Sequence, residues 1–309
     1  MLTLHLVPVG RSLLSQIEQG ILPTLRSALA VDELLADTVG EALRQATGGN
    51  HELDLKRLGL ADVSRSASAA DASLAAEWTS VAAVAAKRRY SAVDGEAYVF
   101  IATDTDDGLR AATLVAARYQ STIHYLHEPL SVGRPALEPC GVYVCRIPDL
   151  DLGFRPPTST TWRSLGTVGG IAADTAKQTG RGEWEIILHL TGGYKAMIPY
   201  LMVLAEGVNS RLRELPPDTQ HRPKIRAVAL HDPSLGRTPT QPRIVIDIPV
   251  RAIGSNLLAE ARKLKALARP DSDTVGADVS KDLRGLFIER ENARTYRLSE
   301  AGLIMVNVL

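Results

Sequence analysis

A segment with two glycines and a lysine follows a strongly apolar run and has the composition of a phosphate-binding turn. Paired glycines let the backbone approach a ligand closely. Free N–H groups at the start of a following helix attract anions, and a lysine adds a mobile positive charge. The alternative is a tight strand–helix turn with a solvated lysine. The segment comprises Thr191, Gly192, Gly193, Tyr194 and Lys195.

Two further segments place hydroxyl and carboxylate groups directly after apolar runs. The first holds Gly10, Arg11 and Ser12, and the Ser12 hydroxyl can cap the next helix and still face a ligand. For Asp104 and Asp107 in the second, we favour caps and turn contacts over metal ligands. No carboxylate–histidine cluster elsewhere supports a metal, so we expect no metal and no other cofactor. The second segment runs through Thr103, Asp104, Thr105, Asp106 and Asp107.

The elements that must position these segments alternate along the chain. Because each strand is a short continuous apolar run, the pattern predicts a doubly wound α/β domain with a mainly parallel sheet over residues 1–250. Ligands of such sheets bind at the carboxyl ends of the strands, where all three segments are expected to lie. Strands are predicted at 4–9, 97–102, 141–145, 185–190, 225–230 and 243–248, and helices at 13–43, 61–89, 109–119, 167–177 and from 195 to about 210.

Residues 251–309 have a different pattern: a basic helix at 257–267, a short helix at 278–285, a hairpin over 286–298 and a last helix from 299. This order resembles a small winged-helix domain. Either DNA contact or dimerisation would suit it. The apolar stretch 303–309 is expected to form a dimer contact or to pack inside the same small domain.

Composition and absent motifs exclude several classes of protein. The 35 basic residues balance the 35 acidic residues, which argues against a protein that coats nucleic acid through bulk charge. Two cysteines, Cys140 and Cys145, are too few for a disulfide scaffold. No apolar run is long enough to span a membrane and the N-terminus lacks a basic leader, so we expect a cytoplasmic protein. Neither a dinucleotide-binding G-x-G-x-x-G nor a Walker A motif occurs at these segments.

Three stretches, in this order, resemble the CRISPR-associated Rossmann fold (CARF) proteins of type III CRISPR defence. They are Val7-Pro-Val-Gly-Arg-Ser-Leu-Leu14, Ile101-Ala-Thr-Asp-Thr-Asp-Asp-Gly108 and His189-Leu-Thr-Gly-Gly-Tyr-Lys-Ala-Met-Ile-Pro-Tyr200. Thr-Gly-Gly-x-Lys-Ala with Pro-Tyr downstream is the most specific part. A winged helix after the CARF domain makes the chain most similar to a standalone ring nuclease. Arg11, His189 and Tyr194 depart from the residues usual in the family.

The resemblance implies binding of a cyclic oligoadenylate, with cyclic tetra-adenylate favoured over cyclic hexa-adenylate, by a homodimer. It further implies metal-independent ring cleavage, in which a ribose 2′-hydroxyl attacks the adjacent phosphate and leaves a 2′,3′-cyclic phosphate. Lys195 and Ser12 would be catalytic: Lys195 would neutralise the developing charge, and Ser12 would orient the phosphate or ribose. The amides of Gly192 and Gly193 would hold the phosphate, and the other residues of the three segments would line the site.

The competing class is a ligand-gated regulator that senses the ring without cleaving it. In that case the winged helix would read DNA with the basic residues of the C-terminal segment. A solvated helix face is the simpler explanation for those charges. The basic residues are Arg262, Lys263, Lys265, Arg269 and Arg284.

Overall fold

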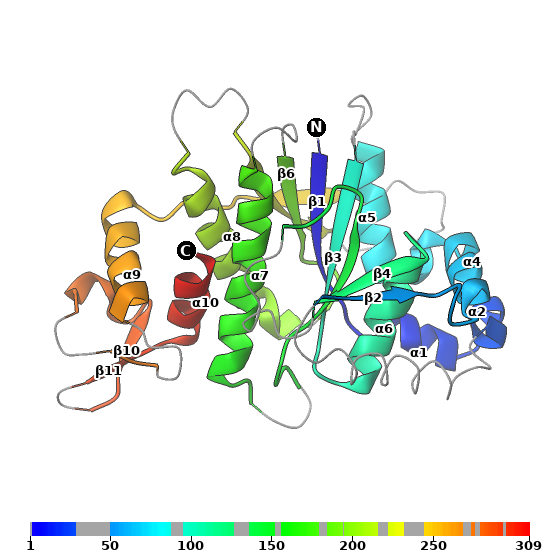
Figure 1. Ribbon diagram of the computed structural model, residues 1–309, viewed down its shortest axis with the longest axis horizontal. Coiled ribbons are helices and arrows are strands. Elements are labelled where there is room, and N and C mark those ends of the chain that lie inside the picture. The colour runs from blue at the N-terminus through cyan, green and yellow to red at the C-terminus, as the bar shows by residue number, and fades with distance from the viewer. Residues whose placement is uncertain are drawn as a thin grey trace.

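A computed structural model shows how these elements assemble (Figure 1). It describes residues 2–28, 50–87, 95–126, 136–151, 156–178, 184–193, 195–215, 222–231, 244–267, 273–275, 279–292 and 295–309.

An eight-stranded sheet forms the centre, in the order β2-β4-β5-β3-β1-β6-β7-β8. The six inner strands are parallel, and the edge strands β2 and β8 run antiparallel to their neighbours. The predicted α/β class with a mainly parallel sheet is therefore confirmed. The strands are β1 (Leu2–Pro8), β2 (Asn50–Asp54), β3 (Gly95–Ala102), β4 (Thr122–Leu126), β5 (Val142–Arg146), β6 (Trp184–His189), β7 (Lys224–Leu230) and β8 (Val245–Ile248).

Helices cover both faces of the sheet. One face packs on α7 (Ser159–Lys177), α8 (Ile198–Leu212) and α10 (Glu300–Val308), as the shared core of these helices with Leu4 and Leu6 shows. The other face packs on a second set of helices, which share a core with Val7 and Phe100. This set comprises α1 (Ser12–Glu18), α2 (Pro23–Ala28), α4 (Ala61–Ala69), α5 (Ala76–Lys87) and α6 (Asp106–Ala117).

Several element boundaries differ from the sequence prediction. The first predicted helix is interrupted at Gly20, whose φ is +72°, and its continuation beyond residue 28 lies outside the described residues. The predicted helix 61–89 is three pieces, α4, the 3-10 turn η1 (Ala72–Leu74) and α5, since Asp71 caps η1. Strands β2 and β4 were not predicted. Helix α7 begins earlier than expected, where the Thr158 amide donates to the Thr161 hydroxyl.

The C-terminal segment contains α9 (Ser255–Leu267), the 3-10 turn η3 (Lys281–Leu283) and a small antiparallel sheet. The predicted hairpin is present, and the predicted helix at 278–285 is limited to η3 among the described residues. The small sheet has the order β10-β11-β9, with β9 (Thr274–Val275), β10 (Ile288–Arg290) and β11 (Tyr296–Leu298).

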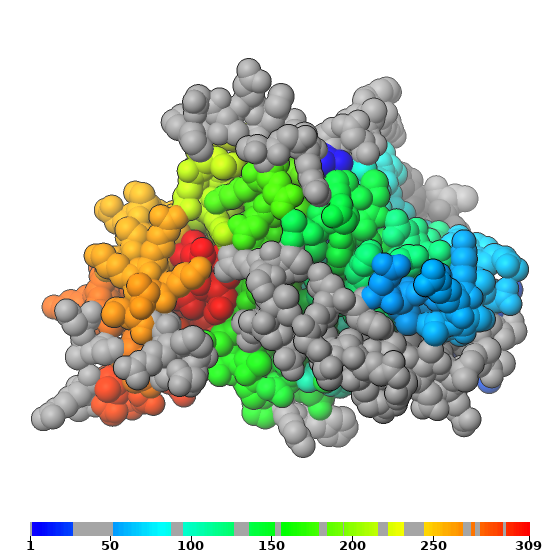
Figure 2. All heavy atoms as spheres, viewed as in Figure 1, coloured from blue at the N-terminus to red at the C-terminus, as the bar shows by residue number. Residues whose placement is uncertain are grey.

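Helix α10 does not leave an apolar strip exposed. Leu303, Ile304, Met305 and Val308 are buried against α7 and α8, in the same core as the central sheet. Figure 2 shows only a small patch of red α10 atoms between the orange α9 and the neighbouring atoms. The sequence left two alternatives for 303–309, a dimer contact or packing inside the small C-terminal domain. These side chains pack within the chain, but against α7 and α8 rather than inside the C-terminal segment. No described helix is long and apolar enough to cross a membrane.

Small residues on α7 allow this close contact. A Cβ at Gly166 would lie 2.3 Å from the Ile304 carbonyl oxygen, and one at Gly169 would lie 2.9 Å from Val308. We expect Gly166→Ala to push α10 away from α7 and to lower the free energy of unfolding by about 1–3 kcal/mol. Urea unfolding of the purified chain measures this. Gly254→Ala, where a Cβ meets nothing within 4 Å, is the control; equal stability of the two variants would contradict the prediction.

Candidate functional site

The three predicted segments meet at the carboxyl edge of the sheet. They follow the three central neighbouring strands β1, β3 and β6. In Figure 1, β1 starts near the N label and runs toward α1, so this edge lies at the lower side of the picture. Gly10 and Gly193 are in direct backbone contact, since a Cβ at Gly10 would lie 3.2 Å from the Gly193 Cα. The convergence predicted from the sequence is therefore present in the structure.

The side chain of Glu77 joins two of these segments by hydrogen bonds. It lies in the first turn of α5 and its side chain is only 1% exposed. Its Oε1 accepts the Gly10 amide at 2.9 Å, and its Oε2 accepts the Ser12 hydroxyl at 2.9 Å. The Gly193 amide also donates to this carboxylate. One buried carboxylate thus fixes both the segment after β1 and the segment after β6.

The glycines of these segments are required by this close packing. Gly193 has a φ of +78°, which favours glycine. A Cβ at Gly192 would lie 2.8 Å from the Glu77 Cγ and 2.8 Å from the Pro8 carbonyl oxygen. The paired glycines therefore bring the backbone against Glu77 rather than leaving it open.

Two roles expected from the sequence change with this geometry. The Gly193 amide is directed at Glu77, so it does not face outward to receive a phosphate. Ser12 is not a cap: α1 begins at Ser12, its N-cap residue is Arg11, and the Ser12 hydroxyl donates to Glu77.

The electrostatics of Glu77 combine two opposing effects. Burial raises the pKa of Glu77 above its ordinary value of 4.5, because the ionised form loses its water. Hydrogen bonds from Gly10, Ser12 and Gly193, and from its own amide, act in the opposite direction by stabilising the carboxylate. The net direction is upward, so Glu77 is a stronger base than an exposed glutamate.

Sequence reasoning missed Glu77. It lies in an Ala- and Ser-rich stretch beside Trp78, which is fully buried. The available signal was spacing: Glu77, Val81 and Val84 stand at i, i+4 and i+7, so they share one helix face. A carboxylate in a core-facing stripe needs partners, and that requirement marks it as a candidate.

The third segment is mainly structural. Asp104 pairs with Arg146 and accepts the Asp149 amide, and Thr105 caps α6 by accepting the Gly108 amide at 3.0 Å. Thr103 is buried and contacts the Thr105 hydroxyl.

The preference for turn contacts at Asp104 agrees with these bonds. Asp107 reaches toward the first segment and pairs with Arg11 at 3.0 Å. This ion pair links the segments after β1 and β3.

Lys195 opens the 3-10 turn η2 (Lys195–Met197) ahead of α8, and its side chain is exposed. No carboxylate in the described part of the chain forms an ion pair with it. The Thr191 hydroxyl accepts the Leu230 amide at 2.8 Å, which ties the start of this segment to β7. Tyr194 lies outside the described residues.

A second set of buried polar groups connects α5 with the strands β6 and β1, and Glu77 is not part of it. The Ser80 hydroxyl lies 2.7 Å from His189 Nδ1, and His189 Nε2 lies 2.9 Å from His5 Nδ1. The other ring nitrogen of His5 faces Glu96 at 3.8 Å. His189, a departure from the CARF pattern, is thus a buried partner of Ser80 and His5 rather than a ligand-facing residue.

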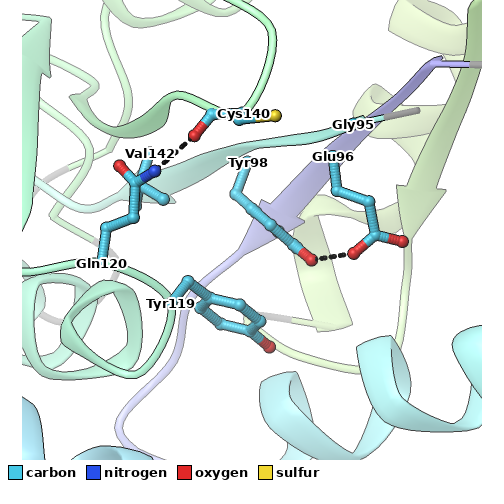
Figure 3. Close-up of a pocket in the computed structure, with 7 residues that line it drawn as sticks. All are labelled: Gly95, Glu96, Tyr98, Tyr119, Gln120, Cys140 and Val142. Atoms are coloured by element: carbon cyan, nitrogen blue, oxygen red, sulfur yellow. Dashed lines mark hydrogen bonds between the residues drawn. The ribbon is translucent and has the colours of Figure 1, made fainter. Parts of the chain in front are cut away.

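A pocket of about 390 Å³ lies at the opposite, amino edge of the sheet. Figure 3 shows the stacked rings of Tyr98 and Tyr119, with the Tyr98 hydroxyl directed at Glu96. The pocket starts where β3 and β5 begin, so it is separate from the three segments. Its lining residues are Gly95, Glu96, Tyr98, Tyr119, Gln120, Cys140 and Val142.

Within the described residues, no three His, Cys, Asp or Glu side chains gather as a metal-ion site would require. No protein-family model matches the chain, and no curated protein matches it. The resemblance to CARF proteins therefore rests on the three quoted segments.

The raised pKa of Glu77 makes stability depend on pH in a defined direction. The folded state holds the Glu77 proton more tightly than the unfolded chain does, so the stability that protonation contributes is lost as pH rises from about 4.5 through the higher folded value. We expect the stability of wild type relative to Glu77→Gln to fall over that pH range. Urea unfolding of both proteins at pH values from about 4 to 8 tests this. A difference that stays constant with pH would show the interpretation to be wrong.

Proposed function

We propose that the protein is a CARF-type ring nuclease with a Rossmann-like sheet and a winged-helix-like C-terminal segment. It binds a cyclic oligoadenylate, with cyclic tetra-adenylate favoured over cyclic hexa-adenylate, and cleaves it without a metal. The product is a linear oligoadenylate with a 2′,3′-cyclic phosphate end, so the reaction switches off type III CRISPR signalling in antiviral defence. The supporting observation is that three family-like segments, far apart in sequence, meet at one edge of the sheet with Gly10 against Gly193.

The charges at this edge support Lys195 as the cationic residue of the proposed site. Arg11 is also exposed, but Glu18 at 3.2 Å and Asp107 at 3.0 Å offset its charge. Lys195 has no such partner among the described residues, so its ammonium is available to a phosphate. Charge stabilisation by such a group acts mainly on the transition state, where negative charge builds on the phosphate oxygens.

The second candidate is the sensor that binds the ring without cleaving it and reads DNA through the C-terminal segment. Basic residues there have partners within the fold. Arg262 pairs with Glu214, Lys263 with Glu260 at 2.5 Å, and Arg284 lies over the Tyr296 ring. Because these charges are partly offset, the observation favours the ring nuclease.

The test is a time course of cyclic tetra-adenylate cleavage by the full chain, with and without EDTA. We expect cleavage in both conditions and a loss of roughly 100- to 1,000-fold in Lys195→Ala, whose exposed side chain has little packing to lose. Ser12→Ala should lose less, since a neutral hydrogen bond is weaker than a charge-assisted one.

Lys224→Ala is the control, because Lys224 is exposed at the start of β7, on the opposite edge. Calorimetry with each ring establishes binding. Tight binding without cleavage would replace the nuclease by the sensor, loss of activity in EDTA would contradict the metal-free reaction, and no binding would reject both.

The proposal also predicts a homodimer. A ring with rotational symmetry is matched by a two-fold axis that presents each segment twice. Light scattering at micromolar concentration should give twice the mass of the chain. A stable monomer that still cleaves the ring would contradict this arrangement.

A further inference from the structure

The contact with Glu77 sets the hydrogen-bond polarity of the Ser12 hydroxyl, that is, whether it donates to or accepts from a ligand. A serine hydroxyl has one hydrogen to donate, and Ser12 donates it to Glu77 Oε2 at 2.9 Å. Glu77 is surrounded by donors, the amides of Gly10 and Gly193 among them, so its carboxylate serves as an acceptor. While Glu77 is ionised, the Ser12 oxygen is left with lone pairs only. It can accept a hydrogen bond from a ligand and has none to give to a phosphate oxygen.

This polarity decides between the two roles expected for Ser12, orienting the phosphate or orienting the ribose. The bridging phosphates of a cyclic oligoadenylate are ionised diesters and carry no proton, so they need donors. A ribose 2′-hydroxyl has a proton to give, and it is also the nucleophile of the proposed reaction. Ser12 therefore matches the 2′-hydroxyl.

Resting on the proposed function, we infer that Glu77 and Ser12 form a proton relay that activates the ribose 2′-hydroxyl. The 2′-hydroxyl proton moves to Ser12 Oγ as the Ser12 proton moves to Glu77 Oε2. The 2′-oxygen forms a bond to the adjacent phosphorus, and the bond from phosphorus to the 5′-oxygen breaks. The 5′-oxygen takes a proton from the Lys195 ammonium. Glu77 ends protonated and Lys195 neutral, and exchange with water restores both.

The burial of Glu77 suits it to this task. A carboxylate that is 1% exposed has no bulk water to hydrate it, which favours proton uptake. Its distance from the ligand, with Ser12 in between, keeps its negative charge away from the phosphates. Since it touches no substrate atom, Glu77 is a positioning residue that acts through Ser12.

Glu77→Gln is the discriminating variant. The glutamine oxygen can still accept the Gly10 amide, and its NH2 group can donate to Ser12, so the segment after β1 stays bonded to α5 while the proton acceptor is lost. In single-turnover assays we expect cleavage of cyclic tetra-adenylate to fall about 100-fold, which is the lower end of the typical contribution of a general base and less than the loss expected for Lys195→Ala. The Kd for the ring should stay within about fivefold, equivalent to one neutral hydrogen bond.

Two further variants separate a relay from a structural support. Ser12→Ala should lose a similar factor, and the double variant should lose no more than either single one, because both remove the same step. Glu96→Gln is the matched control, since Glu96 also bonds a hydroxyl, that of Tyr98, at the opposite edge. It should cleave as wild type does.

The outcomes are distinct. An active wild type with an equally active Glu77→Gln overturns the relay and leaves the ring nuclease standing. Loss of ring binding together with cleavage in Glu77→Gln, or multiplied losses in the double variant, also overturns the relay, because Glu77 would then only support the loops. A wild type that binds the ring without cleaving it overturns both proposals.

Discussion

A carboxylate without access to water governs the architecture of this edge of the sheet. Glu77 must find hydrogen-bond donors inside the protein, and it finds them in two loops that lie far apart in sequence. Satisfying one side chain therefore fixes the path of both loops. The same negative charge lies beneath the surface that a phosphate ligand would approach. Lys195, which forms no ion pair within the described part of the chain, is exposed at the same edge.

Helix α5 carries more than one polar group into the core. Glu77 and Ser80 are three residues apart on the helix face that meets the sheet, and each bonds a different partner there. Ser80 is hydrogen-bonded to His189 on β6, and His189 in turn is hydrogen-bonded to His5 on β1. Trp78 anchors the opposite side of α5 through its indole N–H, which donates to the Val115 carbonyl at 3.0 Å. Hydrogen bonds on two sides of α5 thus fix the orientation of the helix about its own axis. The helix in turn holds the two loops that bond Glu77.

The sequence was sufficient to predict the meeting of the three loops and six of the eight strands of the central sheet, all except β2 and β4, because continuous apolar runs and glycines have strong local signals. The sequence was insufficient where contacts between residues far apart in the chain determine the structure. Strand β2 is polar and lies at an edge, so periodicity did not reveal it. Glu77 gains its role only from loops that fold against it. The direction of the Gly193 amide likewise depends on Glu77, since a glycine pair alone fits both an open phosphate turn and a closed one.

The position of α10 has a consequence for the synthesis of the protein. Helices α7 and α8 leave the ribosome well before α10 is made, yet α10 fills the small-residue face between them. Until then, the nascent chain presents an uncovered apolar groove on one face of its sheet. Pairings between segments so distant in sequence form slowly, and exposed apolar surface invites association with other chains. This face of the fold is therefore covered only after α10 itself has been synthesised.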